Sequence, residues 1–441
     1  MYLNGNWVPA SPEAAFDVIN PADGSVLEQV YDGGQAQARE AIEAAAQAFK
    51  SWSKTTPYER AAILSKAHGL MLERKEDLAR TMTLEQGKPL RAARTEVQYG
   101  ADFLSWFAEE AKRINGETIP SARADQRFIV AHQAVGVVAA VTPWNYPVSM
   151  ITRKVAPALA AGCTVVIKPA EFTPLTALAA AELAVRAGIP PGVLNVLTAD
   201  SDNSVQAGKV FCSSDKVRHI SFTGSTEVGR ILMAQSAPTV KKLALELGGN
   251  APFIVFDDAD IEAAVMGAIS GIFAASGQTC IAGSRLLLQR SIHDAFVKRL
   301  VEVAGAARIG DPMSPETNVG PVTTPPQYDK VLDYIAIAKG EGARCVLGGK
   351  PYTGPGVSGS QFVEPTIFTD VRNDMRIAQE EVFGPVLAVI SFDDEEDALR
   401  IANDIDFGLA AGVWTSDIGR AIRMSEKLEV GTVWVNTYRA V

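Results

Sequence analysis

The sequence has few of the residues from which metal sites and disulfides are built. Its 441 residues include four cysteines and four histidines, widely scattered along the chain. No Cys-x-x-Cys pair occurs, and no spacing matches a zinc site. We therefore expect no resident metal and a reducing, cytoplasmic location, which also suits a thiol used in catalysis.

Long apolar runs and an excess of positive charge are also lacking. No apolar run approaches the ~18 residues that a membrane span needs, and the N-terminus has no basic region followed by an apolar one. With 51 acidic against 41 basic residues the formal net charge is −10, which argues against nucleic acid or an anionic membrane as the main partner. We expect instead a soluble protein of two or three domains.

What the sequence does contain is a helical N-terminal region followed by alternating strands and helices. An Asn-Gly pair predicts a tight hairpin turn between Leu3 and Trp7. The polar surroundings of the strand at 127–131 place it in a protruding hairpin rather than in a core sheet. Apolar periodicity predicts helices over 35–51, 57–84 and 96–113.

From residue 135 onward, apolar runs alternate with amphipathic helices. Near-continuous apolar strands joined by helical crossovers are typical of a doubly wound parallel sheet. After Asn250 the alternation restarts with a helix over 261–275, which predicts a second α/β domain. In the first sheet, strands are expected at 135–141, 163–168, 193–197, 219–222 and 243–246, with helices at 151–161, 176–187, 204–211 and 226–236.

A single thiol closes the short polar run Ser276-Gly277-Gln278-Thr279-Cys280, and a lone carboxylate, Glu246, stands upstream between leucines and before two glycines. Thiolates are strong nucleophiles, and a carboxylate in apolar surroundings can serve as a general base. We predict that Cys280 attacks a carbonyl carbon and that Glu246 activates the water that releases the product. Taken singly, the two residues are more often a buried apolar cysteine and a paired structural carboxylate.

Polar motifs follow three of the expected parallel strands, at the edge where such sheets bind ligands. Gly224 and Ser225 open a helix as a phosphate-binding turn does, although their GxxxxG spacing also suits an ordinary glycine turn. Lys168 and Glu171 could meet a ribose or a phosphate, or could be solvated loop charges. Asn145 lies between two prolines, where its amide could face an oxyanion or simply belong to a rigid turn.

Six motifs occur in the order and spacing of the aldehyde dehydrogenase superfamily, which the chain resembles along essentially its whole length. They are Pro143-Trp144-Asn145, Lys168-Pro169-Ala170-Glu171, Phe222-Thr223-Gly224-Ser225, Glu246-Leu247-Gly248-Gly249, Gly277-Gln278-Thr279-Cys280 and Glu380-Glu381-Val382-Phe383-Gly384-Pro385. The resemblance implies NAD(P)-dependent oxidation of an aldehyde to a carboxylic acid. Within the superfamily, the run 150–163 is most similar to succinate-semialdehyde dehydrogenases.

The resemblance implies a mechanism through a covalent intermediate. Cys280 adds to the aldehyde as a thiohemiacetal, whose oxyanion is held by Asn145 and by the Cys280 backbone N–H. Hydride transfer to the nicotinamide then leaves a thioester, for which Glu246 activates the hydrolytic water. Lys154 matches a lysine often assigned to proton relay.

The resemblance also implies the cofactor contacts. Because a carboxylate suits a free ribose 2′-hydroxyl and repels a 2′-phosphate, Glu171 favours NAD over NADP, although Lys168 could offset that repulsion. The cofactor-binding residues implied are Pro143 and Trp144, Lys168 and Glu171 at the adenosine ribose, Gly224 and Ser225 by the pyrophosphate, and Glu381 and Phe383 by the nicotinamide ribose.

The substrate is less sharply indicated. Arg153 matches an arginine that helps to hold the substrate carboxylate in succinate-semialdehyde dehydrogenases. Their second arginine, six positions before the nucleophile, is Ala274 here, and the second cysteine of redox-regulated members is Ala282. Because a lost guanidinium removes a bidentate anchor, a less polar or aromatic aldehyde is expected as much as succinic semialdehyde.

On the same resemblance we expect a cofactor domain of 1–118 and 135–249, a catalytic domain of 250–431, and a bridging element of 119–134 and 432–441 that forms a homodimer or homotetramer. Family members continue into a C-terminal strand that pairs across a subunit interface, whereas this sequence stops at Val441, so we take that strand to be missing from it. Two alternatives stand beside this hypothesis. One is acyl transfer to coenzyme A, against which Glu246 argues; the other is a catalytically impaired cofactor-binding protein that lacks that strand.

Overall fold

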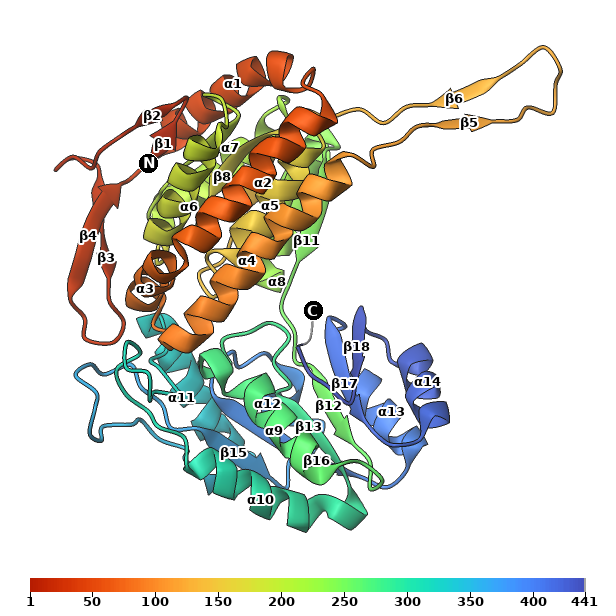
Figure 1. Ribbon diagram of the computed structural model, residues 1–441. Coiled ribbons are helices and arrows are strands. Elements are labelled where there is room, and N and C mark those ends of the chain that lie inside the picture. The colour runs from red at the N-terminus through yellow and green to blue at the C-terminus, as the bar shows by residue number, and fades with distance from the viewer. Residues whose placement is uncertain (440–441) are drawn as a thin grey trace. The chain divides into compact units, whose positions relative to one another are not determined.

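The computed structural model describes residues 1–439, which form two compact units (Figure 1). Residues 440 and 441, the end of the expected bridging segment 432–441, lie outside the described residues. Two short segments of the N-terminal half group with the second unit, whereas we expected all of 1–118 in the cofactor domain. The first unit comprises Met1–Ile19, Val26–Glu85 and Ala93–Glu246, and the second comprises Asn20–Ser25, Gln86–Ala92 and the chain from Leu247 onward.

The first unit is built on a seven-stranded sheet in the order β11-β10-β7-β8-β9-β1-β2. All five expected parallel strands and all four crossover helices are present, so the doubly wound parallel sheet is confirmed. The parallel strands are β7 (Val137–Val141), β8 (Thr164–Lys168), β9 (Leu194–Val196), β10 (Val217–Thr223) and β11 (Lys242–Glu246). The helices are α5 (Ser149–Ala160), α6 (Pro174–Ala187), α7 (Ser201–Ser213) and α8 (Thr226–Ser236), and a short 3₁₀ turn, Ala237–Thr239, follows α8.

Four N-terminal helices belong to the helical region expected from periodicity. They are α1 (Gln35–Trp52), α2 (Pro57–Glu73), α3 (Lys75–Gln86) and α4 (Leu90–Ala111). The single helix predicted over 57–84 is wrong, because the chain turns at Arg74 and divides it into α2 and α3. The start of α2 follows the sequence rules closely, since Thr56 caps it, Pro57 takes the first helical position and Glu59 closes a capping box.

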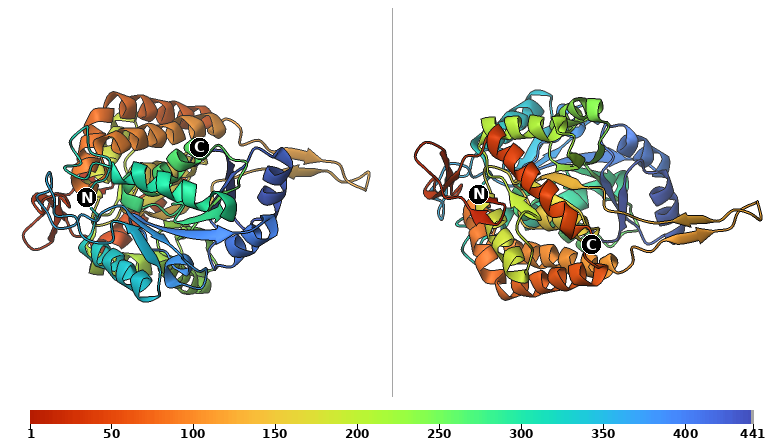
Figure 2. Two further views of the ribbon diagram at one scale, coloured as in Figure 1. Left: turned by 90° about the horizontal axis from the view of Figure 1, so that it is seen from below. Right: turned by 90° about the horizontal axis from the view of Figure 1, so that it is seen from above.

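Three hairpins complete the first unit. In the first, β1 (Tyr2–Leu3) and β2 (Asn6–Trp7) are joined by Asn4 and Gly5 at φ 48° and 86°, the positive values that the Asn-Gly pair predicted. A second hairpin, β3 (Ala15–Ile19) and β4 (Val26–Tyr31), was not predicted. The third, β5 (Glu117–Ile119) and β6 (Phe128–Val130), is a separate, fully exposed ribbon. It protrudes from its unit in every view (Figures 1 and 2), as predicted.

The second unit contains another seven-stranded sheet, in the order β14-β15-β16-β13-β12-β17-β18, with only β14 antiparallel. Apolar clusters cover both of its faces, so the expected second α/β domain is confirmed. The strands are β12 (Pro252–Val255), β13 (Arg285–Gln289), β14 (Arg344–Leu347), β15 (Thr366–Thr369), β16 (Val386–Phe392), β17 (Ala410–Trp414) and β18 (Thr432–Val435). The helices are α9 (Ile261–Ile272), α10 (His293–Gly305), α11 (Pro325–Gly340), α12 (Arg376–Gln379), α13 (Glu395–Asn403) and α14 (Ile418–Lys427), with 3₁₀ turns at Ala274–Gly277 and Arg290–Ile292.

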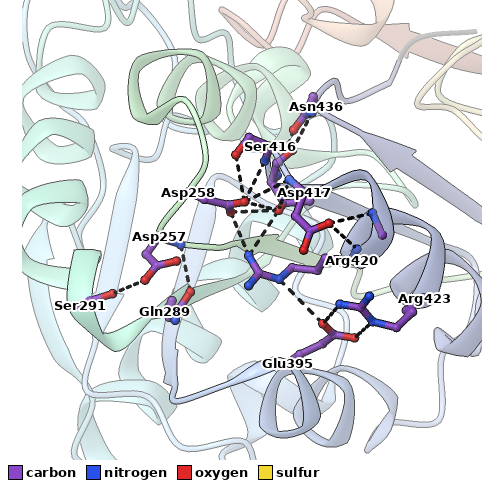
Figure 3. A network of polar contacts seen from close by, with 12 residues as sticks. Asp257, Asp258, Gln289, Ser291, Glu395, Ser416, Asp417, Arg420, Arg423 and Asn436 are labelled. Atoms are coloured by element: carbon purple, nitrogen blue, oxygen red, sulfur yellow. Dashed lines mark hydrogen bonds and ion pairs between the residues drawn. The ribbon is translucent and has the colours of Figure 1, made fainter.

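A polar network ties the carboxyl ends of β12 and β17 together (Figure 3). The Asp258 carboxylate accepts hydrogen bonds from the Thr415 hydroxyl (2.8 Å) and the Ser416 backbone N–H (3.1 Å), and it pairs with Arg420 (3.0 Å). Arg420 also lies over the ring of Phe256, 4.3 Å from its centroid. The Asp258 carboxylate also accepts the N–H of Asp417 (3.1 Å), the N-cap of α14, so the network holds the start of α14 against the end of β12.

Candidate active site

The carboxyl ends of the parallel strands in the first unit carry most of the residues that the sequence singled out. The strand order changes direction between β7 and β10, which is where open α/β sheets bind ligands. Thr142 follows β7 and donates its N–H to the Lys168 carbonyl at the end of β8 (3.2 Å). Gly224 follows β10 and donates to the Glu246 carbonyl at the end of β11 (3.1 Å). The predicted cofactor motifs of this unit therefore lie together at the carboxyl ends of neighbouring strands of one sheet.

Asn145 is buried in the loop between β7 and α5. The end of that loop is held by Glu96 of α4, whose buried carboxylate accepts hydrogen bonds from the backbone N–H groups of Val148 (3.0 Å) and Ser149 (3.2 Å). Sequence reasoning missed Glu96. Glu96 lies between Thr95 and Val97 in an amphipathic helix, and no periodicity reveals its use as a cap for a distant helix.

Lys154 and Glu246 interact electrostatically within the first unit. The Lys154 ammonium is buried and donates to the Ser221 hydroxyl on β10 (3.2 Å). Burial, assisted by the neighbouring Arg153 charge and opposed by Glu246, lowers the pKa of Lys154 to about 8. Glu246 itself is exposed at the end of β11, so the expectation of an apolar setting for this carboxylate is wrong. The reason is that β11 is an edge strand with a half-exposed face.

Lys168 and Glu171 form an ion pair at the carboxyl end of β8, with Nζ and Oε2 3.5 Å apart. Burial lowers the pKa of the Lys168 ammonium, and Glu171 partly opposes that shift. The same Nζ donates to the Ser204 hydroxyl on α7 (2.6 Å). Ser225 is the N-cap of α8 and accepts a hydrogen bond from the Val228 N–H. The Lys168 ammonium, the Glu171 carboxylate and the N-terminus of α8 all lie at the carboxyl ends of the strands, and such groups fit the phosphates and ribose of a dinucleotide.

Cys280 lies half-buried in a loop of the second unit, between the 3₁₀ turn after α9 and β13. Gly249 approaches it so closely that a Cβ there would lie 2.4 Å from the Cys280 carbonyl oxygen. The Glu381 carboxylate accepts the Gly249 N–H (2.9 Å), and burial raises the pKa of Glu381. The Asn250 amide donates to the Glu380 carbonyl (2.9 Å). The second unit thus brings together the motifs around 249, 280 and 381, far apart in sequence.

The segment before Cys280 has an unusual backbone. Helix α9 ends at Ile272, so the helix predicted over 261–275 is too long. Ala275, Ser276 and Gly277 then take φ values of 58°, 55° and 71°, three successive residues in the left-handed region. A Cβ on Gly277 would lie 1.9 Å from the Gly384 carbonyl oxygen, next to Phe383, which is also left-handed. Only glycine fits at 277, which explains that part of the motif.

Tyr438 contacts the chain directly after Cys280. Its hydroxyl donates to the carbonyl of Ile281 (2.9 Å), and its ring packs against Phe253 and Trp434 in the core of the second unit. Burial strongly raises the pKa of Tyr438. Ala282, at the position of the second cysteine in redox-regulated members, is buried in the same apolar cluster.

Arg153 lies on α5 of the first unit among aromatic side chains. Its guanidinium is 5.4 Å from the ring centroid of Phe103 on α4 and donates to the Met150 sulfur (3.7 Å). Burial raises the pKa of nearby Tyr99, and the Arg153 charge opposes that shift. None of the four cysteines, all in the described part of the chain, forms a disulfide. Among residues 1–439 no three metal-ligating side chains gather, and no helix is long and apolar enough to cross a membrane.

Comparison with known proteins gives a consistent picture. The aldehyde dehydrogenase family model matches residues 7–441. Mitochondrial succinate-semialdehyde dehydrogenase of Oryza sativa subsp. japonica is 50% identical over 98% of this chain and 81% of its own length. Succinate-semialdehyde dehydrogenase [NADP(+)] GabD of Escherichia coli is 48% identical, covering 99% and 89%. Glutarate-semialdehyde dehydrogenase of Pseudomonas aeruginosa is also 48% identical, covering 99% and 89%.

Solved structures agree with this likeness. The crystal structure of an E. coli NADP-dependent enzyme superposes with a TM-score of 0.96 at 48% identity, covering 100% of this chain and 90% of that one. An indole-3-acetaldehyde dehydrogenase in complex with NAD⁺ gives a TM-score of 0.96 at 42% identity, covering 100% and 89%.

Proposed function

This chain belongs to the aldehyde dehydrogenase family, and from that premise we propose that it oxidises a short aldehyde carrying an anionic group, with Cys280 as the nucleophile. The enzyme converts an aldehyde to a carboxylic acid and uses NAD or NADP as hydride acceptor. The observation that carries the assignment of the nucleophile is the Cys280 loop. Its thiol is half-buried, its backbone requires glycine at 277, and Gly249, which Glu381 holds, approaches the Cys280 carbonyl closely.

The chain's own groups have the following roles in this proposal. The Cys280 thiolate adds to the carbonyl carbon, and the Asn145 amide and the Cys280 backbone N–H stabilise the oxyanion. After oxidation of this adduct to a thioester, Glu246 takes a proton from water, which attacks the thioester carbonyl and expels the thiolate. Exposure of Glu246 at a strand end supports this role, since the base must reach water.

Lys154 receives the proton that Glu246 acquires. Its lowered pKa, near 8, allows its amine to exchange protons near neutral pH, whereas an ordinary lysine would stay charged. The hydrogen bond to Ser221 holds the amine at the sheet face beside β11.

The bound dinucleotide supplies the hydride acceptor, and Pro143, Trp144, Lys168, Glu171, Gly224, Ser225, Glu381 and Phe383 would hold it. We propose a preference for NAD. The Glu171 carboxylate is already paired with the buried Lys168, so the pair as a whole offers little net positive charge to a 2′-phosphate. Glu171→Gln should then raise the ratio of NADP to NAD turnover.

The proposed substrate class rests on Arg153 and on the relatives. Succinate and glutarate semialdehydes, named in three of the relatives above, each carry a carboxylate at the end opposite the aldehyde. Arg153, half-buried between Phe103 and Met150, offers a guanidinium to such a group. Ala274 favours the second candidate, a less polar aldehyde, because one guanidinium alone holds a carboxylate less firmly.

A substrate panel separates these candidates. Succinic semialdehyde, glutaric semialdehyde, butanal and phenylacetaldehyde are assayed for NADH and NADPH formation. We expect kcat/KM for a semialdehyde to exceed that for butanal at least about tenfold. Arg153→Ala should erase that difference by raising KM for the semialdehyde only, and Arg153→Lys should restore part of it. Equal losses on butanal and semialdehyde would contradict the role of Arg153.

The nucleophile has its own test. Cys280→Ala should abolish turnover, by about 10⁴-fold or more, while dinucleotide binding measured by calorimetry stays unchanged. Retained turnover would refute the nucleophile assignment.

We also propose that the β5–β6 hairpin joins two or four copies of the chain in the cytoplasm. The hairpin exposes Ile119, Phe128 and Ile129 on a ribbon with no core of its own, and such apolar surface is normally covered. Light scattering on the protein and on an Ile129→Lys variant tests the assembly, because a charge there should shift it toward the monomer.

A further inference from the structure

The nucleophile loop, residues 275–280, is held by contacts that its own sequence does not explain. Its three left-handed residues, 275–277, include two with side chains, and each such residue costs about 1 kcal/mol or more relative to ordinary backbone. A conformation of this kind persists only when surrounding structure imposes it.

The loop is fixed on one side by residues 320–323, in the connection between α10 and α11. The Ser276 hydroxyl donates to the Gly320 carbonyl (2.8 Å). The Gln278 side-chain oxygen accepts the Thr323 backbone N–H (2.8 Å), and its amide donates to the Pro321 carbonyl (3.4 Å). Both loop side chains are almost completely buried. Three hydrogen bonds thus join the loop to one short segment, on either side of Gly277.

Residues 320–323 are in turn held by Gln86, at the end of α3 in sequence but packed within the second unit. The Gln86 side-chain amide donates to the Thr323 hydroxyl (3.0 Å), and that hydroxyl donates to the backbone carbonyl of Gln86 (2.7 Å). The Gln86 side-chain oxygen accepts a hydrogen bond from the Lys88 backbone N–H (2.9 Å). We call the reciprocal pair of Gln86 and Thr323 the clasp. Every polar atom of the Gln86 side chain is used, and both residues are buried.

The backbones at the clasp approach as closely as glycine permits. A Cβ on Gly320 would lie 2.1 Å from the Gly87 carbonyl oxygen, and a Cβ on Gly87 would lie 2.7 Å from Pro321. The segments 86–88, 320–323 and 275–280 are therefore closely packed against one another in that order. A displacement in the first is passed to the third, since close-packed layers leave no void to absorb it.

We propose that Gln86 and Thr323 are positioning residues for Cys280, which hold its sulfur in the reactive place by bracing the nucleophile loop from behind. The proposal rests on the proposed function of Cys280 as nucleophile. Without the Thr323 hydroxyl the buried Gln86 amide loses its acceptor, the segment 320–323 shifts, and the left-handed turn relaxes toward ordinary backbone. A thiol displaced by about 1 Å reacts up to about a hundredfold more slowly, while substrate and cofactor bind as before.

The test compares Thr323→Val, which removes the hydroxyl at constant shape, with Thr323→Ser, which keeps it. Thr317→Val is the matched control. Thr317 is a buried threonine of the same connection, whose hydroxyl donates to the Asp311 carbonyl (2.6 Å) away from the nucleophile loop. For each variant, kcat, KM and thermal midpoint are measured, together with the rate of Cys280 alkylation by iodoacetamide, followed by mass spectrometry of the Cys280 peptide across pH.

We expect Thr323→Val to lower kcat tenfold or more and to change the alkylation rate and its pH profile, at unchanged KM. Thr323→Ser should recover at least half of kcat, and Thr317→Val should lose thermal stability without changing alkylation. Gln86→Glu, which keeps the acceptor for Lys88 and loses the donor, should follow Thr323→Val and serves if the valine variant does not fold. The proposal is overturned if Thr323→Val and Thr317→Val behave alike, or if alkylation is unchanged in both clasp variants. Alkylation is measured without turnover, so these outcomes test the proposal independently of the proposed function. Retained activity of the Cys280→Ala variant would instead refute the proposed function.

Discussion

The first unit and the second hold their reactive groups in different ways. In the first, Thr142 and Gly224 directly follow regular strands and Lys168 ends one, so the ends of regular elements set their positions. In the second, Cys280 follows a left-handed turn held by glycine contacts and by side chains from distant segments. The proposed cofactor site therefore needs little beyond the strand ends of a parallel sheet, whereas the proposed nucleophile, Cys280, needs specific contacts from distant parts of the chain. Backbone changes should harm the second unit far more than the first.

Gly277→Ala should show the largest effect. Its Cβ would lie 1.9 Å from the Gly384 carbonyl oxygen, and the φ of 71° disfavours any side chain. We expect a loss of about 4 kcal/mol or more in the free energy of unfolding, measured with urea. Ala275→Gly, two residues earlier at φ 58°, should instead stabilise the protein by about 1 kcal/mol. If both variants lose stability equally, left-handed strain is not what distinguishes this turn.

Asn145→Ala tests the first unit by its chemistry rather than its stability. Loss of the amide donor should lower kcat about 10²- to 10³-fold, the usual effect of removing one oxyanion donor. The thermal midpoint should fall only slightly, because Glu96 continues to hold the end of the loop through Val148 and Ser149. Steady-state kinetics and a melting curve check this, and a midpoint that collapses with kcat would assign Asn145 a structural role.

The Lys154 ammonium gives a pH-dependent prediction. Its folded-state pKa, about 8, lies below the value of 10.5 expected when unfolded, so the unfolded state binds more protons between these values. The free energy of unfolding should therefore rise between pH 8 and 10.5, by roughly 3 kcal/mol. Below pH 8 the burial cost is fully present. Lys154→Met should be more stable than wild type near neutral pH and should lose this rise in urea titrations. A parallel pH dependence in both proteins would contradict the shift.

Gly69→Ala should have the smallest effect, and in the opposite direction. Gly69 lies inside α2 of the first unit, and a Cβ there would meet nothing within 4 Å. Replacement removes the entropic cost of a helical glycine, so we expect a gain of about 0.5–1 kcal/mol in unfolding free energy by urea titration. A loss instead would show that tight packing extends into the regular helices of the first unit.

Local patterns were sufficient for most of the regular elements, although not for the β3–β4 hairpin. The five strands and four crossover helices of the first sheet, the Asn4–Gly5 turn and the protruding hairpin all matched, because each depends on apolar periodicity or on turn chemistry. The break at Arg74 was missed, since helical periodicity continues on both sides of it. The end of α9 was missed because Ala275 and Ser276 carry no signal for a left-handed turn.

The sequence by itself determined the class of fold, and it predicted the strand ends at which a dinucleotide would bind and the thiol that would act as nucleophile. Only the tertiary structure decided that Glu246 is exposed, that Glu96 caps a helix from a distant one, and that Gln86 and Thr323 stand behind the nucleophile loop. The physical reason is range: periodicity and turn propensity act over a few residues, whereas a hydrogen bond between positions 86 and 323 exists only after the chain has folded.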